Sequence, residues 1–133
     1  MIGIDTNVLV RHLTQDDLVQ AEAAGHFLSL LSEEKPGFVS LVTAVELSWV
    51  LQRAYKAAPS GVMEVIAGLL RAREIIVQSP DLVAKAIDAV KSSSAEFSDA
   101  VISLLGTEAG CEYTITFDRR ACALPGMRLL GTS

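Results

Sequence analysis

Short apolar stretches alternate along this chain with longer segments in which apolar residues recur every three or four positions. The short stretches are predicted to be strands, at 2–4, 38–40, 75–77, 113–117 and 127–130. The longer segments are predicted to be helices, at 5–13, 14–32, 42–57, 62–70, 80–91 and 97–109. Because helices separate successive strands, we expect a central parallel sheet with helices on both faces.

Residues at the helix ends and along the helix faces refine this prediction. Thr14 is interpreted as the cap of the second helix, Pro80 as the first residue of the fifth, and Gly110 as the end of the last. The packing faces of two helices are expected to contain Ala23, Phe27, Leu30 and Leu31, and Val42, Val45, Trp49 and Val50. Trp49 is therefore interpreted as a core residue.

The composition indicates one domain over residues 1–133 with more apolar residues than its core needs. Half of the residues are hydrophobic and the mean hydropathy is +0.40, which suggests apolar surface reserved for a partner. No apolar run reaches the roughly 20 residues that span a bilayer. Met1 is followed at once by a strand and no basic region precedes it, so we expect no signal peptide and a cytoplasmic protein.

The net charge of −5 argues against a nucleic-acid partner, since nucleic-acid-binding proteins are usually basic. Four of the acids, however, belong to the candidate site described next, and setting them aside leaves a charge of −1. If divalent cations neutralise these four, the objection weakens. The two cysteines, Cys111 and Cys122, match no metal-binding spacing and are interpreted as reduced core thiols.

Two candidate site acids lie in the first half of the chain. Asp5 follows the first strand, where open α/β folds bind their ligands, although it could simply cap the next helix. Glu46 lies between apolar neighbours in its helix. Burial of a lone carboxylate costs several kcal/mol, so Glu46 is predicted to be a site residue unless Arg11 or Arg53 pairs with it.

Two further candidates lie in the second half. Asp99 is in the first turn of its helix, three residues after Glu96 and on the same face, so the two acids repel unless a cation lies between them. Asp118 follows a strand and either caps the next turn or binds a metal. Arg119 and Arg120 could bind phosphate or be solvated. Nearby hydroxyl groups, of Thr6, Ser98 and Thr116, could orient the acids or cap helices and turns.

The four acids lie in stretches that resemble the motifs of the PIN-domain nucleases. These stretches are Ile-Asp-Thr-Asn-Val-Leu at 4–9, Val-Glu-Leu at 45–47, Phe-Ser-Asp-Ala at 97–100 and Thr-Phe-Asp-Arg at 116–119. Their order and spacing resemble the VapC toxins of toxin–antitoxin pairs. The resemblance covers essentially the whole chain, and it departs from the family at Glu96, where an aspartate is often present.

The resemblance implies a three-layer α/β/α sandwich and metal-dependent cleavage of RNA. It implies Mg²⁺ or Mn²⁺ held by Asp5 and Asp99, with Glu46 and Asp118 completing the pocket. It also implies a homodimer and an antitoxin whose tail blocks the site. Carboxylate oxygens are suitable ligands for Mg²⁺, and a bound ion can activate water and polarise a phosphate.

Two other classes of function remain as alternatives. A PIN-like module that binds without catalysis would keep the fold, but the four acids argue against lost activity. An aspartyl phosphotransfer protein would use the strand-end Asp5 as nucleophile. The phosphatase pattern then requires an aspartate where this chain has Asn7, and a receiver domain requires a late strand-end lysine that this chain lacks.

Overall fold

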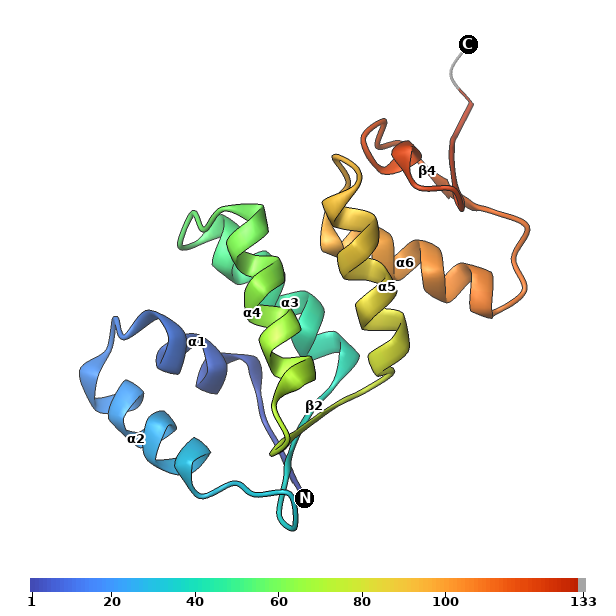
Figure 1. The fold of residues 1–133 in the computed structure, drawn as a ribbon. Coiled ribbons are helices and arrows are strands. Elements are labelled where there is room, and N and C mark those ends of the chain that lie inside the picture. Colours follow the sequence, from blue (N-terminus) through green and yellow to red (C-terminus); the bar gives the residue numbers. More distant parts are fainter. Residues whose placement is uncertain (132–133) are drawn as a thin grey trace. The chain divides into compact units, whose positions relative to one another are not determined.

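The computed structural model describes residues 1–131 and confirms the alternation of strands and helices (Figure 1). The elements are β1 (Ile2–Gly3), α1 (Thr6–Thr14), α2 (Leu18–Ser29), β2 (Gly37–Val39), α3 (Leu41–Arg53), α4 (Pro59–Arg71), β3 (Ile75–Val77), α5 (Pro80–Lys91), α6 (Phe97–Glu108), β4 (Thr114–Thr116), the 3-10 turn η1 (Ala121–Ala123) and β5 (Met127–Leu129). Contacts between residues divide the chain into two compact units, residues 1–80 and the part from Asp81 onward. That the two units form a single domain stays a prediction.

The first unit contains a three-stranded parallel sheet in the order β1-β2-β3. Ile2 pairs with Gly37, and Gly37 pairs in turn with Ile75. The strands are parallel because two helices separate each from the next, which gives the chain the length it needs to return to the same edge. The carboxyl ends of β1 and β2 therefore share one edge, where Asp5 and the start of α3 follow them.

The core of the first unit lies among α1, α3, α4 and the sheet. Its most deeply buried side chains come from β2, α3 and α4, namely Val39, Ala44, Leu47, Val62, Met63 and Ile66. The buried face of α3 consists of Thr43, Ala44, Leu47, Ser48 and Leu51. The predicted face of this helix was wrong, since Val42 is 74% and Trp49 53% exposed. α3 carries apolar residues on most of its circumference, so helical spacing alone could not select the packed face.

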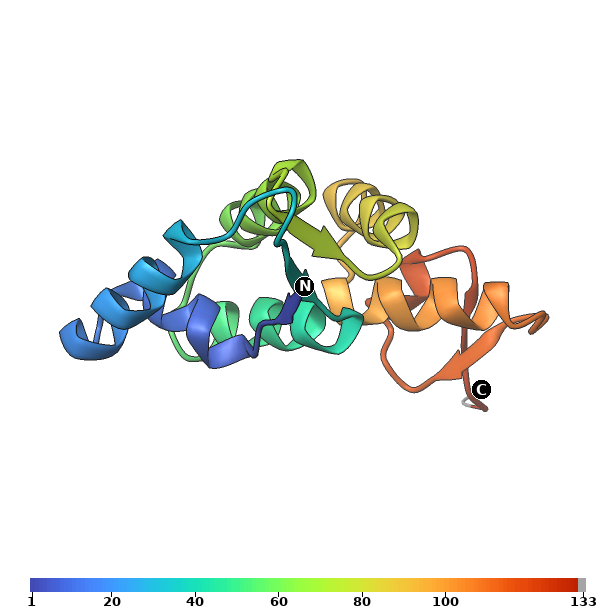
Figure 2. The same cartoon turned by 90° about the horizontal axis from the view of Figure 1, so that it is seen from below.

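The start and the packing of α2 also differ from the prediction. Thr14 is the last residue of α1 and does not cap α2, because its hydroxyl donates to the carbonyl of Val10 at 2.8 Å. Asp17 is the cap instead, and it accepts the N–H of Gln20 at 3.0 Å. The buried residues of α2 are Ala21 and Ala24, in place of the bulkier face expected. Small side chains let α2 lie close beside α1, as both views show (Figures 1 and 2).

The second unit contains α5, α6 and a two-stranded parallel sheet of β4 and β5. Thr114 pairs with Met127 and Thr116 with Leu129. α5 begins at Pro80 as predicted. Gly110 follows the end of α6 with a φ of +90°, a conformation that glycine adopts without strain.

The cysteines do not lie in the core, so the prediction that they are buried was wrong. Both thiols are free, Cys111 is exposed and Cys122 is partly buried. Cys111 follows Gly110 in the turn after α6, where the chain runs over the surface. Among residues 1–131, no helix has the length and apolar character that crossing a membrane requires.

Candidate functional site

Asp5 lies two residues after the end of β1 and caps α1. Its backbone is extended, with φ −77° and ψ 157°, and its Oδ1 accepts the N–H of Thr6 at 2.7 Å. The capping role considered from the sequence is therefore real. The carboxylate is also exposed, so capping leaves it able to accept further ligands.

Glu46 lies in the second turn of α3 and is exposed, so the prediction that it is buried was wrong. The hydroxyl of Thr6 donates a hydrogen bond to Oε1 of Glu46. Arg11, one of the two arginines considered as its partner, donates to Gln20 at 2.7 Å and pairs with Asp16 at 3.4 Å. A site role for Glu46 cannot rest on the cost of its burial; its contact with Thr6 is the relevant observation.

Thr6 brings the first two candidate acids together. Its N–H binds Asp5 and its hydroxyl binds Glu46, although Thr6 and Glu46 are 40 positions apart. Thr6 itself is only 5% exposed. Thr6 therefore links the segment that follows β1 to the second turn of α3. Its two hydrogen-bond donors, the N–H and the hydroxyl, each bind one of the acids.

The second unit holds the other candidates around the start of α6. Asp99 is the third residue of α6 and accepts the N–H of Glu96, the cap residue, at 3.3 Å. Asp118 is exposed and accepts the N–H of Arg120 at 2.9 Å, which confirms its predicted capping role. Nη2 of Arg120 lies 3.6 Å from Oε1 of Glu96. No sequence motif connects the two residues of this ion pair.

The pKa of Asp99 is raised above its usual value. Partial burial is the main cause, and the negative charges of Asp118 and Glu96 add to it, while the N–H of Glu96 and the charge of Arg120 act in the opposite direction. Asp118 and Glu96 are therefore each close enough to repel Asp99. A cation bound at this place would remove that repulsion.

The donors in both units are chemically suited to Mg²⁺ or Mn²⁺, which prefer hard carboxylate oxygens. The structure links Asp5 with Glu46 through Thr6, and it places Asp118 and Glu96 within electrostatic range of Asp99. Within residues 1–131 no group of three or more His, Cys, Asp or Glu side chains is arranged to hold a metal ion. That all four predicted acids share one metal pocket stays a prediction.

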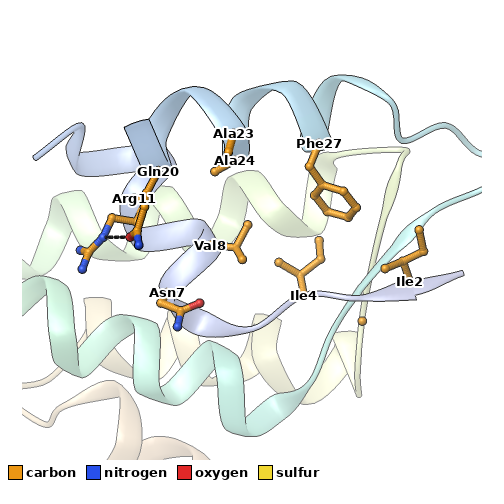
Figure 3. A pocket seen from close by; sticks show the side chains of 10 residues that line it. Ile2, Ile4, Asn7, Val8, Arg11, Gln20, Ala23, Ala24 and Phe27 are labelled. Carbon is orange, nitrogen blue, oxygen red and sulfur yellow. Dashed lines mark hydrogen bonds between the residues drawn. The ribbon is translucent and has the colours of Figure 1, made fainter. Parts of the chain in front are cut away.

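A largely apolar cavity of about 480 Å³ lies in the first unit, and Asp5 is not among the residues that line it. β1, α1 and α2 enclose it, and its apolar walls include Ile4, Val8 and Phe27. Figure 3 shows Arg11 hydrogen-bonded to Gln20 at one end, with Ile2, Ile4 and Phe27 toward the other. Phe27, expected from the sequence to pack in the core, lines this cavity instead.

Comparison with known proteins identifies one family. Residues 2–126 match the model of the PIN domain. The match spans both units and includes all four predicted acids. The comparison with curated proteins gave no match.

Proposed function

Because this chain belongs to the PIN-domain family, whose members are generally nucleases, we propose that it is a metal-dependent endoribonuclease that acts as the toxin of a type II toxin–antitoxin pair. The family match supports a hydrolase that acts on nucleic acids. The choice of RNA and of a toxin role is supported by the order and spacing of the four acidic motifs, which resemble those of VapC toxins.

The observation that carries the metal dependence is the grouping of Glu96 and Asp118 near Asp99, which accepts the N–H of Glu96 and lies within range of both negative charges. Like charges held close together are unfavourable unless a cation lies among them, and hard carboxylate oxygens favour a divalent cation. We assign Asp5 and Asp99 as the direct ligands of Mg²⁺ or Mn²⁺. Asp118 is assigned as an outer ligand, or as a ligand of a second ion.

The bound ion would supply positive charge to the scissile phosphate and increase the acidity of water. Glu46 is exposed and anchored by Thr6, so its carboxylate can bind the attacking water by hydrogen bonds and orient it. Arg119 is exposed next to Asp118 and can bind a phosphate of the RNA backbone.

The proposed protein partners are an antitoxin and a second copy of the chain. Large apolar side chains are exposed on α2 and α3, among them Leu18 and Trp49, and they supply surface for a homodimer. The apolar cavity lined by β1, α1 and α2 is the place we assign to the antitoxin's tail. A basic side chain of that tail would extend to the acids and block RNA by occupying the site.

Cleavage of RNA by the purified protein tests the catalytic assignment. Asp5→Asn and Asp99→Asn are expected to reduce the rate by about 10²-fold or more, the scale seen when one charge-stabilising group is lost from an active site. EDTA should abolish wild-type activity, and Mg²⁺ or Mn²⁺ should restore it. Asp16→Asn, an exposed acid outside the site, is the matched control and should cleave normally. Wild-type rates in either site variant would contradict the assignment.

A catalytically silent binding module is the second candidate, and one observation favours it. Asp5, Asp99 and Asp118 each accept a backbone N–H, so each has a structural role without any metal. A protein of this kind would bind RNA equally well with EDTA and would never cut it. The cleavage assay therefore separates the two candidates directly.

Expression of the chain alone in cells tests the toxin role. Growth should stop, and Asp99→Asn should remove the effect while the protein still accumulates. Co-expression of the adjacent gene should restore growth if that gene encodes the antitoxin. A chain that cleaves RNA in vitro but is harmless without any partner would leave the nuclease and exclude the toxin.

A further inference from the structure

The contact between Thr6 and Glu46 suggests a role for a residue that carries no charge. Thr6 is the first residue of α1, is nearly fully buried, and donates both its N–H and its hydroxyl to acids. We propose that Thr6 is a positioning residue, whose hydroxyl fixes the Glu46 carboxylate relative to that of Asp5. The inference rests on the proposed nuclease function, in which Glu46 orients water.

The two side chains differ in how firmly the protein holds them. Glu46 is exposed and has a long side chain with several rotatable bonds, so packing does not fix its carboxylate. Thr6 is β-branched and buried, which restricts its side chain to few rotamers. A rigid donor therefore holds a flexible acceptor. Thr6 fixes the position of the Glu46 carboxylate, and Glu46 does not fix the position of Thr6.

The two hydrogen bonds of Thr6 also respond differently to substitution. The bond to Asp5 uses the backbone N–H, which every residue except proline retains. The bond to Glu46 uses the hydroxyl, which valine lacks and serine keeps. Thr6→Val has nearly the same shape as the native residue and removes only the contact with Glu46. Thr6→Ser keeps the contact and removes one buried methyl group.

A purely structural role would give the opposite ranking of the two variants. If the side chain of Thr6 served only by packing in the core, where it is 5% exposed, loss of function would follow loss of stability. Thr6→Ser should then be the more harmful change, because a buried methyl group stabilises a core. If Thr6 positions Glu46, serine should restore function even where it lowers the melting temperature.

The test compares both variants in two assays on the full chain. For RNA cleavage, Thr6→Val should lower kcat with little change in KM. For binding of Mn²⁺ alone, measured by titration calorimetry, it should weaken affinity. The expected loss in kcat, Mn²⁺ affinity or both is about 10- to 100-fold, as for other groups that orient metal ligands through hydrogen bonds. Thr6→Ser should remain near wild type in both assays.

A second comparison asks whether Thr6 acts through Glu46. In a Glu46→Gln background, adding Thr6→Val should cause no further loss, since the carboxylate that Thr6 positions is already gone. Equal losses in Thr6→Val and Thr6→Ser, or wild-type kcat and Mn²⁺ affinity in Thr6→Val, would overturn the inference. If wild-type protein cuts no RNA, the proposed function fails. The Mn²⁺ titrations then still decide whether Thr6 positions a metal-binding carboxylate.

Discussion

Replacement of Asp99 by asparagine should stabilise the protein when no metal is bound. In the folded state Asp99 is partly buried and lies near the negative charges of Asp118 and Glu96, and these effects raise its pKa. Asparagine removes the charge, and its side-chain oxygen can still accept the N–H of Glu96 that Asp99 accepts. The variant therefore loses the repulsion and retains the local hydrogen bond at the start of α6.

The pH dependence of this stabilisation follows from the direction of the shift. Well below 3.8, the reference pKa of an aspartate, Asp99 is protonated in both the folded and the unfolded chain, so the charge makes no difference. As the pH rises above that value, the unfolded chain loses its proton first, and the folded state becomes less stable relative to it. Above the raised pKa of the folded state the cost is constant. The gain from Asp99→Asn should therefore be largest at neutral pH.

The size of the effect is limited by solvent. Asp118 is exposed and Asp99 only partly buried, and pairs of charges at such positions interact by about 0.2–1 kcal/mol. Partial burial and two repulsive pairs disfavour the charged Asp99, and the N–H of Glu96 and the charge of Arg120 oppose them. A net gain of at most about 1 kcal/mol corresponds to a rise in melting temperature of a few degrees, roughly 3–5 °C, for a chain of this size.

Added metal should reverse the order of stability of the wild type and Asp99→Asn. A ligand that binds only the folded state at a hundred times its Kd stabilises by about 2.7 kcal/mol, which exceeds the gain from removing the charge. Thermal unfolding with EDTA should therefore rank Asp99→Asn above wild type. The same measurement with saturating Mn²⁺ should rank wild type above the variant.

Asp16→Asn provides a control in which removing the charge should change the stability in the opposite direction. The hydroxyl of Tyr55 is the main cause that lowers the pKa of Asp16, with smaller contributions from Thr14 and Arg11. Loss of this charge should destabilise the protein at neutral pH, and the difference should disappear as the pH falls through the lowered pKa. Metal should not change it. A wild type that is as stable as Asp99→Asn at neutral pH in EDTA, and that shows no gain with Mn²⁺, would refute the reasoning.

Two further predictions concern packing and assembly. A methyl group on Gly37 would lie 2.5 Å from Cδ1 of Ile4 and 2.9 Å from Cδ1 of Leu31, so Gly37→Ala should destabilise by about 1–3 kcal/mol, and adding Ile4→Val should recover part of that loss in urea unfolding. Sedimentation should detect a dimer that dissociates on dilution. Trp49→Lys should weaken this dimer if the exposed face of α3 forms part of the interface. A monomer at every concentration would contradict the proposed homodimer.

The strands and some of the helix starts were predictable from the sequence, although α4 begins at Pro59 and not at the predicted residue 62. β3 occupies the predicted residues 75–77, and α5 begins at Pro80 as expected. Proline fixes its own backbone and glycine tolerates a positive φ, so their effects on local structure hold in most contexts. Thr14 was misread because two acids follow it closely, and either Thr14 or Asp17 could cap a helix.

The packing faces could not be predicted with the same success. α3 has apolar residues at Val42, Val45 and Trp49 as well as at its buried positions, so several faces satisfy helical spacing. α2 packs through Ala21 and Ala24 because α1 lies against it, and the size of the space between two helices is not encoded in either helix alone. Cys111 and Cys122 show the same limit, since apolar character alone did not predict their burial.

For the candidate site, the sequence predicted the four acidic residues but not the contacts that fix their side chains. Glu46 was selected because a buried carboxylate would need a partner, and it proves to be exposed. Its proposed role is more consistent with that exposure, since an acid that orients water must be accessible to water. What the site needs from the fold is then a group that fixes an exposed side chain. Thr6 provides it from 40 positions away, a distance over which local sequence patterns carry no information.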